Sequence, residues 1–398
     1  MLSVTRVRTG LEVLLEDPGH IGDRRWAMLA NQASVTAELE PARTALRGVL
    51  PGSPVRLFAP EHGLDGVEQD MEAVTDRTDP HTGLSVRSLY GVDAATLMPT
   101  DEDLDGVEVM LVDLPDIGCR YYTFAATLDA MMAACERSEI ELFVLDRPNP
   151  MGGLAREGPP VEPGFESFVS RLPTPIRHGL TLGELALLLQ RNRYPDLELS
   201  VLMCEGWRRT SWWDNTGLPW IPPSPNMPTL DTVAIYPGLC LIEATTLSEG
   251  RGTTRPFHLV GAPWVDGHDL VRRLRARSLP GVGFRASVFR PMFGKHCGEV
   301  CQGLEIHVSD RDELRPVALG LEVLKAFHDL DPVAFAWRSE PYEFVSDIPA
   351  LDLLTGSAAA RLAIDSGEPL EPLVESWRPY VSAFEASLEG VILYHHAN

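Results

Sequence analysis

Continuous apolar runs of strand length, separated by segments with helical spacing, constrain the fold of this chain more than any other feature. The runs cover residues 26–30, 55–59, 107–114, 142–146, 197–203 and 232–236. Because they are continuously apolar rather than alternating, we expect strands that are covered on both faces. Helical spacing lies between them, at residues 42–49, 121–137 and 181–192. Strands that alternate with helices in this way are typical of βαβ units around a parallel sheet.

A second region is predicted to begin after Pro256, and the segment 250–263, which is rich in glycine and proline, is the predicted domain boundary. The helical segments of the second region are 268–277 and 314–330, its strands are 284–289 and 303–308, and its end is predominantly helical. A chain of 398 residues is also longer than one ordinary core requires. We therefore predict an α/β protein: a Rossmann-like three-layer sandwich with a mostly parallel sheet over residues 1–255, and a smaller C-terminal α+β domain over residues 256–398 that closes the cleft.

The charge of the chain excludes some partners. Its formal net charge is -23, whereas nucleic acid and anionic membrane surfaces attract an excess of lysine and arginine. No apolar run approaches the length of a membrane span, and the first 17 residues contain acids but no secretory apolar stretch. We therefore expect a cytoplasmic protein that binds neither nucleic acid nor membranes.

The common cofactor and metal motifs are absent. The sequence contains no GxGxxG after its first strand, no P-loop, no GxSxG and no HExxH. Its six cysteines are too sparse for a disulfide framework. His296, Cys297 and Cys301 are the nearest approach to a metal site, but zinc needs a fourth ligand. We expect no metal and no cofactor, and we interpret these thiols as packed at a strand start.

Four polar clusters follow predicted strands or lie in loops that contain glycine. The first is the stretch LFAPEHGLDG, residues 57–66, in which Glu61 and His62 come directly after a buried strand. The carboxyl ends of parallel strands are where ligands bind in open α/β sheets. Partial burial there raises the pKa of a carboxyl group, which suits Glu61 to act as a general acid. The alternative is a glutamate that caps the next turn.

The other clusters hold carboxylates, arginines and tyrosines. Their candidate residues are Asp116, Arg120, Tyr121, Tyr122, Arg147, Asn149, Glu249 and Arg251. Weaker candidates of the same kind are Arg177, His178 and Asn226. Structural alternatives stay open, because Asp116 can pair with Arg120, Asp146 can hold Arg147, and the glycines around Arg251 can form a hinge.

Six ordered stretches resemble the NamZ-type exo-β-N-acetylmuramidases, a family formerly described as a domain of unknown function. They are LFAPEHGLDG from Leu57, VDLPDIGCRYYTF from Val112, LDRPNPMGG from Leu145, RHGLTLGELA from Arg177, PPSPNMP from Pro222 and YPGLCLIEATTLSEGRGTTRPFHLVGAPW from Tyr236. The resemblance covers about half the chain directly, and it departs from the expected pattern at Ala244 and in the missing signal peptide.

The resemblance implies a hydrolase that releases terminal N-acetylmuramic acid from the non-reducing end of peptidoglycan fragments, with a muropeptide or disaccharide as substrate and a role in cell wall recycling. By this resemblance, the acid of the family's PEHG motif corresponds to Glu61, and the arginine of its SEGRGT motif corresponds to Arg251. Glycoside hydrolysis usually needs two carboxyl groups, and Asp116 and Glu249 are the candidates for the second. Arg251, Arg120 and Arg177 are candidates for the lactyl carboxylate of the sugar. The competing hypotheses are a non-catalytic binding protein for muropeptides or anionic sugars and a transferase that handles phosphosugars or nucleotides.

Overall fold

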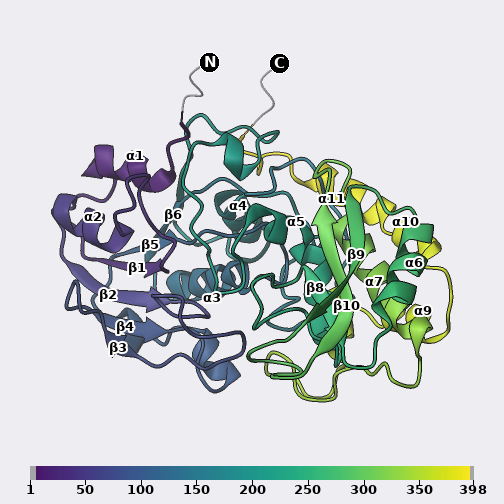
Figure 1. Ribbon diagram of the computed structural model, residues 1–398. Helices are drawn as coiled ribbons and strands as arrows, with labels where there is room; N and C mark the ends of the chain where they lie inside the picture. The colour runs from purple at the N-terminus through teal and green to yellow at the C-terminus, as the bar shows by residue number, and fades with distance from the viewer. Residues whose placement is uncertain (1–5, 395–398) are drawn as a thin grey trace.

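A computed structural model describes residues 6–394 of the chain (Figure 1). Its larger unit is built on a seven-stranded sheet. The strands are β1 (Trp26–Ala30), β2 (Pro54–Ala59), β3 (Arg77–Thr78), β4 (Ser85–Ser88), β5 (Val109–Asp113), β6 (Glu141–Leu145) and β7 (Leu199–Leu202). Their order across the sheet is β3-β4-β2-β1-β5-β6-β7. Every neighbouring pair is parallel except β3 and β4, which are antiparallel. The predicted fold class, α/β with a mostly parallel sheet, is confirmed.

Helices cover both faces of this sheet, because alternate residues of each strand point to opposite sides. On one face Met28 and Leu57 pack with residues of α1 (Gly10–Glu16) and α2 (Ala42–Val49). On the other face Leu29 and Phe58 pack with residues of α3 (Thr123–Arg137) and α4 (Leu182–Arg193). Short 3-10 turns lie in the connections: η1 (Pro18–His20), η2 (Ala94–Leu97), η3 (Glu102–Leu104) and η4 (Trp213–Asn215). Three layers result, with the carboxyl ends of the parallel strands at one edge.

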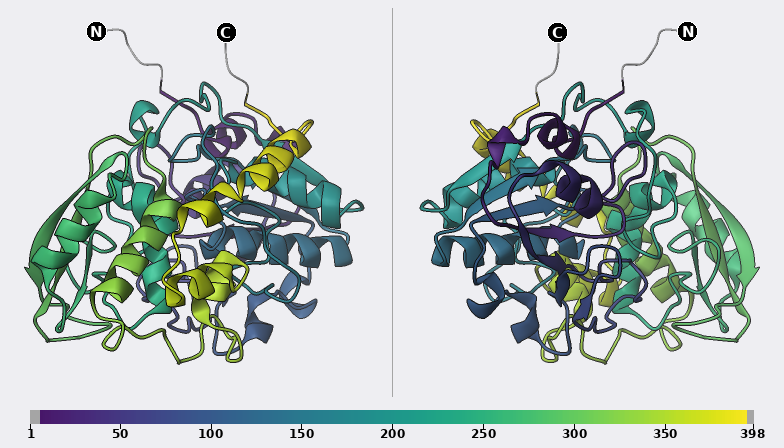
Figure 2. Two further views of the ribbon diagram at one scale, coloured as in Figure 1. Left: turned by 90° about the vertical axis from the view of Figure 1, so that its right-hand side faces the viewer. Right: turned by 90° about the vertical axis from the view of Figure 1, so that its left-hand side faces the viewer.

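The C-terminal part is built on a three-stranded antiparallel sheet. Its strands are β8 (Leu259–Ala262), β9 (Val282–Phe289) and β10 (Cys301–Val308), in the order β8-β10-β9. The helices of this part are α5 (Leu230–Leu239), η5 (Cys240–Ala244), α6 (Gly267–Ala276), α7 (Pro316–Leu330), α8 (Ala350–Thr355), α9 (Ala359–Asp365), α10 (Glu371–Glu375) and α11 (Arg378–Ser387). The chain then returns toward the N-terminal part, as Figure 2 shows. There Tyr394 packs in one cluster with Val7 and Trp207.

Most predicted elements are found, but one is wrong. Residues 232–236, predicted as a strand, lie inside helix α5, which is buried almost throughout. A helix that is apolar on every side has no amphipathic period, so a short stretch of it resembles a buried strand. Among residues 6–394, no helix is long and apolar enough to cross a membrane.

Candidate active site

A pocket lies where the strand ends of the large sheet meet the C-terminal part. The loop after β2, the start of α3, the proline-rich segment before α5 and a turn near residue 343 all contribute to it. Its lining residues are Glu61, His62, Asp70, Tyr121, Tyr122, Thr123, Ser224, Asn226, Met227, Tyr236, Glu243, Arg251, Phe257, Tyr342 and Glu343. The structure thus brings together six of the residues predicted from the sequence: Glu61, His62, Tyr121, Tyr122, Asn226 and Arg251.

Glu61 is held at the end of β2 by a hydrogen bond to each carboxylate oxygen. Thr123 Oγ1, at the start of α3, donates to Oε2 over 2.7 Å, and the backbone N–H of Met71 donates to Oε1 over 3.1 Å. The residue is only 5% exposed. Its neighbour His62 has a φ of 69°, and the Nδ1 atom of His62 lies 2.8 Å from the carbonyl oxygen of Glu68. The carboxyl group therefore has a fixed orientation in the pocket.

Arg251 lies among three carboxylates. Its Nη1 is 2.7 Å from Glu243 Oε1 and 3.4 Å from Glu249 Oε1, and its Nε is 3.0 Å from Asp70 Oδ1. Burial alone lowers the pKa of Arg251, but the carboxylates outweigh burial and raise it well above its usual value. Arg251 also lies over the ring of Phe257, with 5.0 Å between Cζ and the ring centroid.

The turn at residues 342–345 brings two further polar side chains into the pocket. Tyr342 Oη donates to Glu243 Oε2 over 2.7 Å, and Tyr90 Oη, from the loop after β4, donates to Glu343 Oε2 over 2.9 Å. Burial and the charge of Glu61 raise the pKa of Glu343 well above its usual value. Two buried carboxyl groups, those of Glu61 and Glu343, therefore share one pocket.

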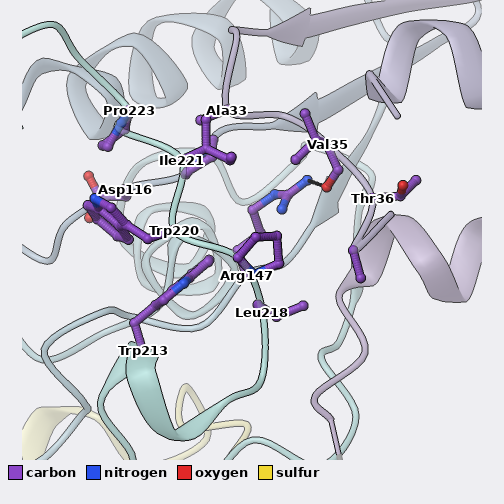
Figure 3. Close-up of a pocket in the computed structure, with 13 residues that line it drawn as sticks. Ala33, Val35, Thr36, Asp116, Arg147, Trp213, Leu218, Trp220, Ile221 and Pro223 are labelled. Atoms are coloured by element: carbon purple, nitrogen blue, oxygen red, sulfur yellow. Dashed lines mark hydrogen bonds between the residues drawn. The ribbon is translucent and has the colours of Figure 1, made fainter. Parts of the chain in front are cut away.

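Two other predicted residues, Asp116 and Arg147, line a different pocket, which also contains Trp213 and Trp220 (Figure 3). Asp116 Oδ2 accepts from the N–H of Gly118 over 2.6 Å, while Oδ1 has no hydrogen-bond partner among the described residues. Burial raises the pKa of Asp116 to about 7.

The structural alternative in which Asp146 holds Arg147 is wrong. Arg147 Nη2 donates to Asp113 Oδ2 over 2.8 Å and to the carbonyl oxygen of Val35 over 2.9 Å, the bond that Figure 3 shows. Asp146 instead accepts from Thr181 Oγ1 over 2.7 Å and from the N–H of Gly183 over 2.8 Å. Those contacts anchor the first turn of α4, since the first N–H groups of a helix have no partners within it.

The remaining predicted residues lie outside the pocket of Glu61. Arg120 is 0% exposed and donates to four backbone carbonyls, so it forms no ion pair with Asp116. Asn149 Nδ2 donates to the carbonyl oxygen of Leu180 over 2.9 Å, and the N–H of Leu180 donates to His178 Nδ1 over 3.1 Å. Burial lowers the pKa of His178 to about 3.

Arg177 and Glu249 also lie outside the lining of that pocket. Arg177 Cζ lies 5.7 Å from the ring centroid of Trp212, and burial lowers the pKa of the Arg177 guanidinium to about 10. Burial opposes the ionisation of Glu249, yet the positive charges of Lys295 and Arg251 lower its pKa to about 2. Lys295 Nζ lies 3.0 Å from Glu249 Oε2.

Seven polar lining residues were missed by sequence reasoning: Asp70, Thr123, Ser224, Tyr236, Glu243, Tyr342 and Glu343. Glu243 lies within the last of the six stretches that resemble the family, so the resemblance could have identified it as a site residue. Asp70 lies in the loop after β2, beyond the stretch 57–66, and the pair at 342–343 follows no predicted strand and lies in no glycine-bearing loop. Within the described part of the chain, no group of three or more His, Cys, Asp or Glu side chains is placed to hold a metal ion.

The Rossmann-like sheet, the pocket at its strand ends and the buried carboxyl groups in that pocket define a hydrolase of the kind that works with acidic side chains. Models of the N-terminal and C-terminal domains of the exo-β-N-acetylmuramidase NamZ match residues 26–231 and 234–394. The chain belongs to the NamZ exo-β-N-acetylmuramidase family.

Individual relatives agree over nearly the full length. The chain is 39% identical over 390 residues to the peptidoglycan β-N-acetylmuramidase NamZ of Bacillus subtilis (strain 168), with 98% of this chain and 92% of that protein covered. A crystal structure of a DUF1343 family protein from Bacteroides fragilis NCTC 9343 matches with a TM-score of 0.88 and 32% identity, over 98% of this chain and 99% of that one. A second such protein from the same strain matches with a TM-score of 0.77 and 26% identity, over 99% and 100%.

Proposed function

We propose that this protein is a glycosidase that releases terminal N-acetylmuramic acid from the non-reducing end of peptidoglycan fragments. Its family membership supports the class of reaction. The observation that carries the proposal is Glu61, a buried carboxyl group at the end of β2 whose two oxygens are fixed by Thr123 and Met71 in the pocket between the two parts of the chain. Muropeptides and their disaccharides are the substrates that this activity requires.

The pocket suits the charge that glycoside hydrolysis develops. The transition state resembles an oxocarbenium ion, so the sugar ring becomes positive as the bond breaks. Glu61 and the neighbouring acidic groups provide negative charge in a buried setting, where electrostatic interactions are strong. Of the three arginines that the resemblance offers for the lactyl carboxylate, Arg251 lines this pocket, whereas Arg120 and Arg177 do not.

A chromogenic β-N-acetylmuramide, compared with its N-acetylglucosaminide analogue, tests the activity. We expect hydrolysis of the muramide, and we expect Glu61→Gln to lower kcat by roughly 10²–10⁴-fold, as loss of a catalytic acid or base does. Glu102→Gln is the matched control, because Glu102 is an exposed carboxyl in η3 that does not line the pocket. Cleavage of neither substrate together with tight binding of a muramyl disaccharide would establish the binding-protein alternative instead.

The cytoplasmic location and the role in cell wall recycling stay predictions from the sequence. Fractionation of cells that express the protein tests the first of them. Release of N-acetylmuramic acid from isolated muropeptides, compared with release from intact wall, tests the second. Activity on intact wall alone would contradict the recycling role.

A further inference from the structure

We propose that Glu343 is the acid that protonates the leaving-group oxygen, while Glu61 is the carboxylate that faces the sugar ring. The inference rests on the proposed glycosidase function and names the second carboxyl group which that function requires. It transfers the acid role that the sequence suggested for Glu61 to a residue from the other part of the chain.

The backbone that presents Glu343 is a tight turn. The N–H of Tyr342 donates to the carbonyl oxygen of Val345 and the reverse bond also forms, both over 2.9 Å. Glu343 and Phe344 lie between these two residues and have φ values of 46° and 68°, respectively. Residues with side chains seldom adopt this left-handed conformation, and consecutive pairs are rarer. Such backbone persists where surrounding contacts hold it, and it clusters at functional sites.

Contacts from the large sheet hold this turn in place. Tyr90, in the loop after β4, donates its hydroxyl to Glu343 Oε2 over 2.9 Å. The ring of Tyr90 also packs edge-on against Phe344, with 5.4 Å between ring centroids. On the other side Tyr342 is bonded to Glu243. The turn is therefore fixed to both parts of the chain, and Glu343 lines the same pocket as Glu61.

The hydrogen bonds of the two carboxyl groups differ. Both oxygens of Glu61 accept hydrogen bonds, from Thr123 and from Met71. Glu343 accepts one bond at Oε2, and its Oε1 has no partner among the described residues. Two ionised carboxylates in one buried pocket repel each other, so one of them retains a proton. The member with an open oxygen atom, Glu343, is the one that can offer this proton to a ligand.

The other acidic groups near the pocket are already engaged. Asp70 and Glu243 pair with Arg251, and Glu249 pairs with both Lys295 and Arg251. Asp116 lines the other pocket. The groups that face Glu343 and affect its ionisation are Glu61 and Asp70 from the loop after β2, Tyr90 from the loop after β4, and Glu243 from η5. Three of these four are acids, which favours the neutral form of Glu343.

The reaction follows from this assignment. The carboxyl proton of Glu343 passes to the glycosidic oxygen as the bond between C1 and that oxygen breaks, and the oxygen keeps the electron pair of the bond. The Glu61 carboxylate offsets the positive charge that forms at C1. Water then gives its hydroxyl group to C1 and its proton to Glu343, which restores the acid. The sum is one water consumed for each bond cleaved.

Leaving groups of different acidity test the assignment. A muramyl disaccharide has a poor leaving group and needs protonation, whereas a dinitrophenyl muramide has a good one and does not. We expect Glu343→Gln to lower kcat/KM for the disaccharide by roughly 10²–10⁴-fold and to change it less than about tenfold for the dinitrophenyl substrate. The alkaline limb of the pH profile should also disappear. Equal losses on both substrates, or no loss on either, would overturn the assignment.

Tyr90→Phe is a second variant, which leaves the carboxyl group in place and removes its hydrogen bond. Because that bond stabilises the ionised form of Glu343, its loss should shift the alkaline limb of kcat/KM for the disaccharide to higher pH. An unchanged limb in Tyr90→Phe would contradict the assignment, even where Glu343→Gln fails to fold. Cleavage by the unaltered protein separates the two proposals: no cleavage of either muramide refutes the proposed function, and normal cleavage by Glu343→Gln refutes this inference alone.

Discussion

Asp116 is a buried carboxyl group whose ionisation should make the stability of the protein depend on pH. Burial raises its pKa from 3.8 to about 7, and one of its oxygens has no partner among the described residues. The folded state therefore holds the Asp116 proton more tightly than the unfolded state does. Linkage then makes the free energy of unfolding fall as the pH rises from about 4 to about 7.

Asp116→Asn should remove this pH-dependent penalty. The variant should gain stability relative to the unaltered protein at pH 8, and the gain should shrink toward pH 5, where Asp116 is neutral in the fold. Each unit of pKa difference corresponds to about 1.4 kcal/mol. Urea unfolding at several pH values measures the effect, with Asp23→Asn, an exposed site, as the control. A difference between Asp116→Asn and the unaltered protein that does not vary with pH would contradict this account.

Left-handed backbone is concentrated around the pocket of Glu61. His62, Phe257 and Glu343 line that pocket and have φ values of 69°, 63° and 46°. Met71, whose N–H holds Glu61, has a φ of 59°. Each such residue costs on the order of 1–3 kcal/mol and is tolerated where the surroundings determine it. The left-handed residues around the pocket therefore lower the free energy of unfolding, and the same backbone fixes the orientation of the pocket's side chains.

Helices α5 and α7 approach each other so closely that glycine is required where they cross. A Cβ atom on Gly238 would lie 1.7 Å from the carbonyl oxygen of Pro316, and one on Gly320 would lie 2.1 Å from the carbonyl oxygen of Gly238. Both obstacles are backbone atoms, which a rotamer change cannot move. The small residues thus set the separation of the two helices, and through it the position of the chain that leads from α5 into η5 and Glu243.

Gly320→Ala should therefore destabilise the protein by about 1–3 kcal/mol, as overpacking does. Gly48→Ala is the matched control. Gly48 lies in helix α2, and a Cβ atom there would have nothing within 4 Å, so the same substitution should stabilise by roughly 0.5–1 kcal/mol. Denaturant unfolding of the two variants gives both values. Equal effects at the two sites would show that the helices can separate without cost.

The strands and helices of the large sheet could be predicted because each carries its own local signal. Helix α2 was predicted with its observed bounds, and α4 begins at the predicted Thr181, its N-cap, which forms a capping box with Glu184. Helix α5 could not be predicted, because a fully buried helix lacks the apolar period that distinguishes it from a strand. A buried strand and a buried helix therefore look alike over a short apolar run, and the strand was the wrong choice for α5.

The candidate site was only partly predictable, for a related reason. Glu61 follows a strand, so its place at the sheet edge could be inferred from the sequence. Glu343 reaches the same pocket through a tertiary contact with Tyr90, and no local pattern reports a contact between segments so far apart. Arg120 shows the opposite error. The polar cluster after β5 suggested that it binds substrate, whereas its Nη1 and Nη2 atoms donate to backbone carbonyls.

At the scale of the whole molecule, Arg120 joins the two parts of the chain. Its Nη1 donates to the carbonyl oxygens of Pro159 and Thr174, over 2.7 and 2.9 Å, and its Nη2 donates to those of Leu354 and Thr355, over 3.0 and 3.1 Å. The last two carbonyls belong to the end of α8. The domain boundary at residue 255 stays a prediction, but this contact makes the loop after β5 part of the same structural unit as α8.

Arg120→Met should therefore weaken the attachment between the two parts. The substitution leaves four carbonyl oxygens without their donor in a buried setting, and each unsatisfied group costs about 1–3 kcal/mol before relaxation. We expect a lower Tm and a thermal transition that broadens or divides in two, measured by calorimetry. Arg191→Met is the control, because exposed Arg191 also donates to two backbone carbonyls, of Ser387 and Glu389, but water can replace it there. A single sharp transition at the original Tm in Arg120→Met would show that the two parts are held together by apolar packing alone.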